Sequence, residues 1–382
     1  MKKNKNPGAL VVSPSMAITD AMPVILFSFS AVFIALIFKS VLFCIGAVLC
    51  VLAGLGKVTW KLIKAFSDKD VRLLFVQMRV LMPTGFLLII ISLFVDKADF
   101  SAVWKNVTGF PCVIFFAAGL AGMIAMTVLA IVTDPGSRRA NIIEQTVNSV
   151  AQLCFLLGII IIWYSSDSYK ADDLAIECIA DTETVTVSQT DTGLFFDGPG
   201  TEKALVFYPG GKVEYTAYTP LMRKIAEERI DCFLCEMPYN LAVFGIDTAD
   251  KIIENYSYNK WYIGGHSLGG AMASTFANER DDISGLVLMG AYPTSQPNCP
   301  TLIIYGSNDG VINRSKLKDG ISFDGVTAIE IPGGNHAQFG SYGNQAGDNN
   351  ADITREEQWN ITANAVARAL LFVAALLLLF SL

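Results

Sequence analysis

The stretch Trp261–Gly270 reads WYIGGHSLGG and decides the fold of the second half of the chain. Apolar residues that favour a β-strand lead into the pentapeptide Gly265–Gly269, and small residues compatible with a helix follow it. This order predicts a strand, a sharp turn and a helix, with Ser267 at the turn. Glycines two residues either side of Ser267 leave room for the backbone to close, and the turn presents the serine hydroxyl to solvent.

A serine hydroxyl is a weak nucleophile and needs a neighbouring base, and the chain has only two histidines. His266 is adjacent to Ser267, so the two side chains diverge, and we expect a packing or orienting role for it. His336 lies in a glycine-rich loop after the β-like run 326–331, where the end of a strand can present an imidazole. We therefore predict that His336 is the base.

The acid that orients this base is expected between the serine and the histidine in the sequence. Asp309 follows the apolar run 301–305 and the turn residues Gly306-Ser307-Asn308. Three other aspartates, Asp281, Asp282 and Asp324, are less well placed because they do not follow such a run as closely. The chain order serine, acid, histidine is the order found in α/β-hydrolases and differs from that of chymotrypsin and subtilisin.

An acyl-transfer site also needs backbone N–H groups directed at the developing oxyanion. The N–H of Leu268, the residue after the serine, is one expected donor. A second donor is expected after an earlier strand, and the strand-like run 204–208 leads directly into Pro209-Gly210-Gly211-Lys212. We predict Gly211 as this donor, with Lys212 as the alternative; no phosphate-binding motif surrounds Lys212.

These residues resemble the bacterial α/β-hydrolases of the dienelactone-hydrolase-like group, over about residues 180–372. The resemblance implies a Ser-His-Asp hydrolase without a cofactor, and the triad positions of the family match Ser267, His336 and Asp309. It implies no particular substrate, and it does not extend to the residues before 166. The blocks that carry it are YPGGKV at 208–213, MPYNLAVFG at 237–245, GGHSLGG at 264–270, YGSNDGV at 305–311 and GGNHAQFG at 333–340.

Strand-like and helix-like patterns alternate through this half of the chain, which is typical of a mostly parallel sheet with helices on both faces. A strand-like segment at 182–188 with 193–196 precedes them. Thr354 and Glu357 form a capping-box pattern at the start of the last helix. Strands are expected at 204–208, 231–236, 260–264, 285–289, 301–305 and 326–331, and helices at 216–229, 247–256, 267–279 and 355–372.

The first part of the chain is too apolar for a soluble domain, and it predicts an all-α transmembrane region at 1–165. Apolar runs cover about 21–56, 80–95, 109–132 and 146–164. A single helix over 21–56 would be about 54 Å long, far beyond a hydrocarbon core of about 30 Å, so we expect two passes there and about five in all.

The basic residues indicate the orientation. With five passes, the basic loops share one side with Lys2, Lys3 and Lys5, and the positive-inside rule makes that side cytoplasmic. The domain at 166–372 is then expected outside the cytoplasm, in a multi-pass protein of the cell membrane. The basic loop residues are Lys57, Lys61, Lys64, Lys69, Arg72, Arg79, Arg138 and Arg139.

Charge and cysteine usage narrow the expected partners. Residues 166–365 carry 13 Lys and Arg against 28 Asp and Glu, a net charge of −15, so we expect no nucleic-acid partner. Cys232 and Cys235 are three apart on an expected strand, so they face opposite sides and do not pair with each other. No zinc-site spacing is present, and we predict neither a metal nor a cofactor.

Two further regions carry predictions of their own. The apolar segment 369–382 extends the last helix, and it either enters the membrane or packs on the transmembrane helices. Several aromatic side chains are candidates for an acyl pocket, although aromatic residues this frequent also form cores. They are Tyr208, Tyr215, Tyr239, Phe244 and Phe339.

The combined prediction is a membrane-anchored serine hydrolase that cleaves a carboxylic ester or related acyl bond of a small or lipid-like molecule. One alternative is a transport or sensing protein that uses the hydrolase fold as a binding domain. The central parts of the spans carry almost no ionisable residue, whereas transport routes usually keep some. The other alternative is an acyltransferase with the same triad, since the sequence does not distinguish water from another acceptor.

Overall fold

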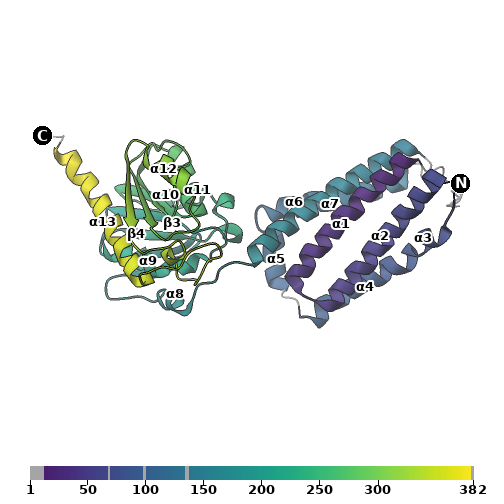
Figure 1. Ribbon diagram of the computed structural model, residues 1–382, viewed down its shortest axis with the longest axis horizontal. Helices are drawn as coiled ribbons and strands as arrows, with labels where there is room; N and C mark the ends of the chain where they lie inside the picture. Colours follow the sequence, from purple (N-terminus) through teal and green to yellow (C-terminus); the bar gives the residue numbers. More distant parts are fainter. Residues whose placement is uncertain (1–12, 68, 98–99, 134–136, 380–382) are drawn as a thin grey trace. The chain divides into compact units, whose positions relative to one another are not determined.

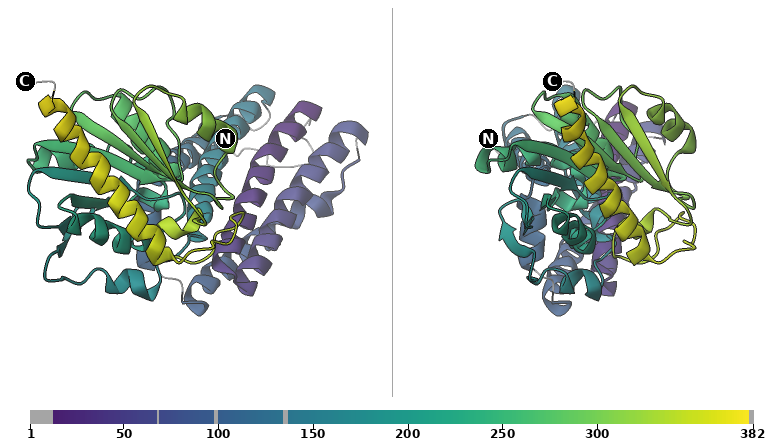
Figure 2. Two further views of the ribbon diagram at one scale, coloured as in Figure 1. Left: turned by 60° about the vertical axis from the view of Figure 1, so that its left-hand side comes forward. Right: turned by 90° about the vertical axis from the view of Figure 1, so that its left-hand side faces the viewer.

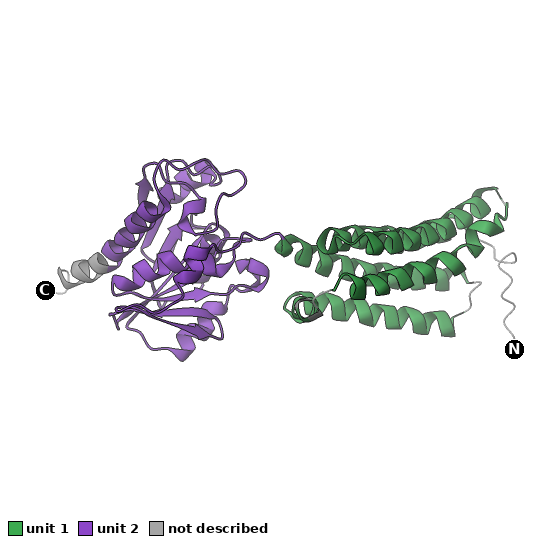
Figure 3. Cartoon of the chain, turned by 90° about the horizontal axis from the view of Figure 1, so that it is seen from below, with its two compact units in different colours: residues 1–166 green, residues 167–382 purple. Residues whose placement is uncertain are grey.

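The computed structural model describes residues 13–67, 69–97, 100–133 and 137–379, with the side chains of 100, 102 and 371–379 outside the description. The chain divides into two compact units, Met1–Ser166 and Asp167–Leu382 (Figure 3). Unit 1 is helical, and unit 2 is built on a β-sheet.

Unit 1 contains five helical segments that are long and apolar enough to cross a membrane: Pro14–Phe38, Val41–Ser67, Arg72–Val95, Cys112–Val132 and Arg138–Ser166. The run predicted to hold two passes is broken at Lys39, which has φ 49°. The helices are α1 (Pro14–Phe38), α2 (Val41–Ser67), α3 (Arg72–Val76), α4 (Met78–Val95), α5 (Phe100–Thr108), α6 (Cys112–Val132) and α7 (Arg138–Ser166), each labelled in Figure 1.

The helices of unit 1 approach each other through small residues. A Cβ added to Gly46 of α2 would lie 2.7 Å from the carbonyl oxygen of Gly85 in α4, and one added to Gly85 would lie 2.6 Å from that of Gly46. Large apolar side chains such as Leu120 and Ile124 point outward instead. Small residues at helix contacts and apolar residues on the outside are typical of membrane helices.

Unit 2 has an eight-stranded sheet in the order β1-β2-β4-β3-β5-β6-β7-β8. Strands β3 to β8 run parallel to one another, whereas β2 pairs antiparallel with β4 and β1 pairs antiparallel with β2 at one edge. The strands are β1 (Thr186–Thr190), β2 (Gly193–Asp197), β3 (Lys203–Tyr208), β4 (Asp231–Cys235), β5 (Lys260–His266), β6 (Ile283–Met289), β7 (Thr301–Gly306) and β8 (Val326–Ile331).

Helices cover both faces of this sheet (Figure 2). Alternate residues of each strand enter two separate cores: Leu205 of β3 packs on the side of α9 and α13, and Val206 on the side of α10, α11 and α12. Cys232 and Cys235 of β4 likewise enter opposite cores, as predicted, and both are unpaired. The helices are α8 (Asp173–Glu177), α9 (Thr219–Glu227), α10 (Thr248–Asn255), α11 (Leu268–Asn278), α12 (Arg314–Ile321) and α13 (Arg355–Leu379).

The predicted mostly parallel sheet with helices on both faces, after an all-α region, is therefore confirmed. Helix α12 was not predicted, because its sequence is polar and only Leu317 and Gly320 are buried. The capping box is present: the Glu357 carboxylate accepts from the N–H of Thr354 at 2.8 Å, and the Thr354 hydroxyl accepts from the N–H of Glu357 at 3.2 Å. The predicted extension 369–382 lies mostly outside the described side chains.

Candidate active site

Ser267 lies at the sharp turn between β5 and α11, with φ 52° and ψ −120°. This conformation is strained for a residue with a side chain. The backbone approaches both neighbouring glycines so closely that no side chain fits there. A Cβ on Gly265 would lie 2.5 Å from the carbonyl carbon of Gly269, and one on Gly269 would lie 2.1 Å from the backbone carbonyl oxygen of Tyr208. The sequence thus forms the expected elbow, because only glycine fits on either side of the serine.

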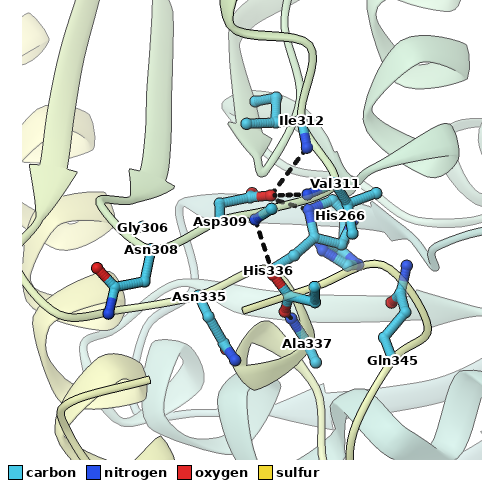
Figure 4. A network of polar contacts seen from close by, with 12 residues as sticks. His266, Gly306, Asn308, Asp309, Val311, Ile312, Asn335, His336, Ala337 and Gln345 are labelled. Atoms are coloured by element: carbon cyan, nitrogen blue, oxygen red, sulfur yellow. Dashed lines mark hydrogen bonds and ion pairs between the residues drawn. The ribbon is translucent and has the colours of Figure 1, made fainter. Parts of the chain in front are cut away.

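Asp309 and His336 are brought into direct contact from the loops after β7 and β8. The Nδ1 atom of His336 lies 2.8 Å from Oδ2 of Asp309, and both side chains are almost completely buried (Figure 4). The other carboxylate oxygen of Asp309 accepts from the N–H groups of Val311, at 2.9 Å, and Ile312, at 2.8 Å. The carboxylate is therefore held in place, and it selects the His336 tautomer that carries its proton on Nδ1.

This tautomer leaves Nε2 of His336 as a proton acceptor. Within the described part of the chain, Nε2 has no hydrogen-bond partner. His336 and Ser267 both line one cavity of about 330 Å³. The other lining residues are Leu268, Ala271, Gly290, Ala291, Tyr292, Val311, Ile312 and Asn313.

Gly290, at the end of β6, makes room for the imidazole of His336, and sequence reasoning missed it. Its φ is 53°, and an added Cβ would lie 2.9 Å from Nδ1 of His336. A larger residue there would collide with the ring and would also be strained. The available signal was a glycine directly after a buried strand.

The predicted oxyanion donors have different environments. Gly211 and Leu268 are close together, since a Cβ on Gly211 would lie 2.9 Å from Cδ2 of Leu268. Across the described ranges, no hydrogen bond occupies the N–H of either residue. The N–H of Lys212 instead donates to the carbonyl of Asn240 at 2.8 Å, so Lys212 is not available as the alternative donor.

His266 has the orienting environment expected for it. Its Nδ1 lies 2.7 Å from the hydroxyl of Tyr218, and that hydroxyl also accepts from the N–H of Gly210 at 3.0 Å. Burial, and next the nearby imidazole of His336, hold the pKa of His266 well below its ordinary value. The contact between Tyr218 and His266 connects the elbow to the loop that carries Gly211.

The predicted pocket aromatics lie elsewhere. Tyr208 is fully buried, and its hydroxyl donates to the carbonyl of Ile246 and accepts from the N–H of Ala249. Phe339 is also fully buried, with its ring 5.5 Å from that of His266. We therefore assign both side chains to the core.

The remaining three aromatics do not line the cavity at Ser267 either. Tyr215 packs at the edge of the core on the α9 side of the sheet. Tyr239 and Phe244 contact each other edge to face at 6.2 Å, in the loop after β4. Sequence blocks identified this loop without showing which way its rings point.

Comparison with known proteins identifies the fold of unit 2. Residues 204–360 match the sequence model of the alpha/beta hydrolase family, and the sheet order and helix placement agree with that fold. A solved structure similar to part of the chain is TT1662 from Thermus thermophilus, with 13% identity and a TM-score of 0.34, covering 40% of this chain and 91% of that one. No curated protein sequence matches. Metal-ligating residues do not cluster in groups of three or more among the described side chains.

Proposed function

We propose that this protein is a membrane-anchored serine hydrolase that cleaves a carboxylic ester or a related acyl bond. The observation that carries the proposal is the buried Asp309–His336 pair, whose free Nε2 belongs to the same cavity as Ser267. The match to the alpha/beta hydrolase family supports hydrolase chemistry in general. The likeness to the dienelactone-hydrolase-like group, stated from sequence blocks, is part of the proposal.

In the proposed first half-reaction, the Ser267 oxygen attacks the acyl carbonyl carbon while Nε2 of His336 takes the serine proton. Asp309 stabilises the resulting imidazolium, and the N–H groups of Gly211 and Leu268 hold the oxyanion. Collapse of the tetrahedral intermediate breaks the bond to the alcohol, which leaves with the proton from His336.

The second half-reaction releases the acyl group. His336 takes a proton from water as the water oxygen attacks the acyl carbonyl. The second tetrahedral intermediate collapses, the acid leaves, and the proton returns to Ser267. An acceptor alcohol in place of water would give the acyltransferase reaction, and product analysis with added alcohols separates the two.

The cavity suggests the acyl group. Apart from Ser267 and His336, its lining includes Leu268, Ala271 and Ile312, and none of the lining side chains is a carboxylate, lysine or arginine. Burying a charged acyl group there would cost several kcal/mol of free energy without a partner. A volume of about 330 Å³ suits a short, uncharged acyl chain.

The proposed location is the cell membrane, with unit 2 outside the cytoplasm. The five apolar helices of unit 1 support the anchoring, and the basic residues of its loops support the orientation. Protease added to intact cells is expected to remove unit 2 and to leave the helices. Full protection of unit 2 would contradict the orientation and would leave the catalytic proposal standing.

Labelling by a fluorophosphonate probe tests the nucleophile. The full-length protein in detergent is expected to be labelled, and Ser267→Ala is expected to abolish the labelling. Ser274→Ala, in helix α11 directly after the Ser267 turn and fully buried, is the matched control and should retain it. Labelling that survives in Ser267→Ala would rule out the assignment.

The substrate is tested with p-nitrophenyl esters of increasing chain length. We expect short acyl chains to be cleaved with the highest kcat/KM, because the cavity is small. Steadily rising activity up to long chains would argue for a lipid-like acyl group bound outside the cavity.

A further inference from the structure

The segment Gly347–Asp352 lies across the two loops that carry the acid and the base, and we refer to it as the bridging segment. Its Asn349 side chain donates to the carbonyl of Asn308 at 3.1 Å, next to Asp309. The carbonyl of Asn349 accepts from the side chain of Asn335 at 2.8 Å, next to His336. The segment therefore contacts both loops within one residue of each functional side chain.

The central contact of the bridging segment is made by the carboxylate of Asp348. Its Oδ1 accepts from the N–H of Gly310 at 2.9 Å, and its Oδ2 accepts from the N–H of Ala337 at 2.8 Å. Gly310 directly follows Asp309, and Ala337 directly follows His336. One carboxylate therefore bonds the backbones of both loops, one oxygen to each.

The bridging segment approaches Gly310, in the loop after β7, very closely. A Cβ on Gly310 would lie 2.8 Å from the carbonyl oxygen of Gly347 and 2.8 Å from Nδ2 of Asn349, so only glycine allows this approach. Oδ1 of Asp348 also accepts from the N–H of Asn349 at 3.0 Å. No lysine or arginine in the described ranges forms an ion pair with Asp348. Its charge is directed at backbone N–H groups, which makes these bonds stronger than neutral ones.

The topology gives the reason for such a contact. The loop that carries His336 follows β8, which is the edge strand and has a sheet neighbour on one side only. Asp309 and His336 lie on separate loops, so the separation of the loops sets the hydrogen bond that orients the imidazole, and a misplacement of about 1 Å can lower a rate about 100-fold. A second link between the two loops fixes that separation.

We propose that Asp348 is a positioning residue that holds the Asp309 loop and the His336 loop at the distance needed for catalysis. This role rests on the proposed hydrolase function, because its value lies in keeping the imidazole aligned with Ser267. Asp348 itself touches no reacting atom.

The informative variant is Asp348→Asn. An amide has the shape of the carboxylate but only one oxygen, so its NH2 group must face one of the two backbone N–H donors. At least one hydrogen bond is lost, and at least one pair of donors oppose each other. The matched control is Asp352→Asn in the same segment, which removes the same charge. The carboxylate of Asp352 accepts from the side chain of Asn308 at 2.9 Å and bonds neither Gly310 nor Ala337.

Both variants are compared as full-length protein, by ester hydrolysis and by thermal unfolding. We expect Asp348→Asn to lower kcat about 10- to 100-fold with KM unchanged, because misplacement by about 1 Å can reduce a rate that much. Asp352→Asn is expected to keep kcat within about twofold of wild type. It is expected to lower the melting temperature about as much as Asp348→Asn does. Equal effects of the two variants on kcat, or no effect of Asp348→Asn, would overturn the proposal.

NMR spectroscopy tests the role of Asp348 without relying on catalytic activity. The chain has only two histidines, so the proton on Nδ1 of His336 can be assigned by NMR of histidine-labelled protein. Asp348→Asn is expected to shift or broaden this resonance, and Asp352→Asn is expected to leave it unchanged. If wild type hydrolyses no ester and takes no fluorophosphonate, the proposed function fails, and the NMR comparison still decides whether Asp348 holds the two loops. An unchanged resonance in Asp348→Asn would refute the role.

Discussion

Large apolar side chains face outward in unit 1 and inward in unit 2. In unit 1, leucine and isoleucine side chains face outward, while glycines and the buried Asp20–Lys61 ion pair lie between helices. In unit 2, residues such as Leu205 are completely buried, and the surface is acidic. Apolar content alone therefore does not predict which side chains form an interior.

The comparison also separates the proposed chemistry from the proposed anchoring. Every residue of the candidate active site belongs to unit 2, where a rigid core holds buried polar groups in fixed positions. Variants in the two units are therefore expected to have effects of different kinds.

The largest expected effect is on catalysis. Asp309→Asn should lower kcat by about 10⁴-fold, because an amide no longer stabilises the imidazolium or selects the correct tautomer. Ile124→Ala, on an outward position of α6 in unit 1, should leave kcat within about twofold. Ester hydrolysis in detergent measures both, and a comparable loss in Ile124→Ala would break the separation.

The next effect is on stability. Leu205→Ala creates a cavity in the core of unit 2 and is expected to cost about 2–5 kcal/mol of unfolding free energy. Leu120→Ala is the counterpart in unit 1, where the side chain is 59% exposed, and it should cost much less. Denaturant unfolding of detergent-solubilised protein compares them. Equal costs would mean that Leu120 is covered by protein, for example by a second copy.

A third variant places a large side chain where two helices of unit 1 approach each other through glycines. Gly85→Leu should destabilise the α2–α4 contact by about 1–3 kcal/mol, because a Cβ there would lie 2.6 Å from the backbone of Gly46 and 2.6 Å from the sulfur of Cys50. Ile90→Leu, on the outward face of the same helix, is the control. Thermal aggregation in detergent reports the loss. Tolerance of Gly85→Leu would show that the two helices are not held this close.

The smallest effect is a pH dependence confined to unit 2, since both histidines of the chain lie there. The pKa of His266 is lowered in the folded state by burial, so the unfolded chain binds its proton first as the pH falls. Stability from this group is present above the unfolded pKa of about 6.5 and is lost below it.

The measurement is the melting temperature of wild type and His266→Gln between pH 7.5 and pH 5. Wild type is expected to lose more stability than the variant over this range, because glutamine does not titrate. Parallel curves for the two proteins would contradict a neutral, buried His266.

Short-range sequence patterns predicted the fold class and most of its elements. The strand-turn-helix at Ser267 and the alternation of strands and helices each depend on residues within a few positions of one another. Helix α12 was missed because its sequence is polar and buries almost nothing. Strands, turns and helices follow from the spacing of apolar residues and glycines over short windows, so they can be predicted without knowing any contact between residues distant in sequence.

Sequence patterns alone were enough to predict the mostly parallel sheet and the apolar helices, and to single out Ser267, Asp309 and His336 as candidates in that chain order. Folding in three dimensions was needed to show that Gly290 makes room for His336, that Tyr218 contacts His266, and that Asp348 bonds the loops of Asp309 and His336. The structure also shows that Tyr208 and Phe339 belong to the core and that the N–H of Lys212 donates to the carbonyl of Asn240. These contacts join loops distant in sequence, and their geometry depends on how the strands of the sheet bring those loops together.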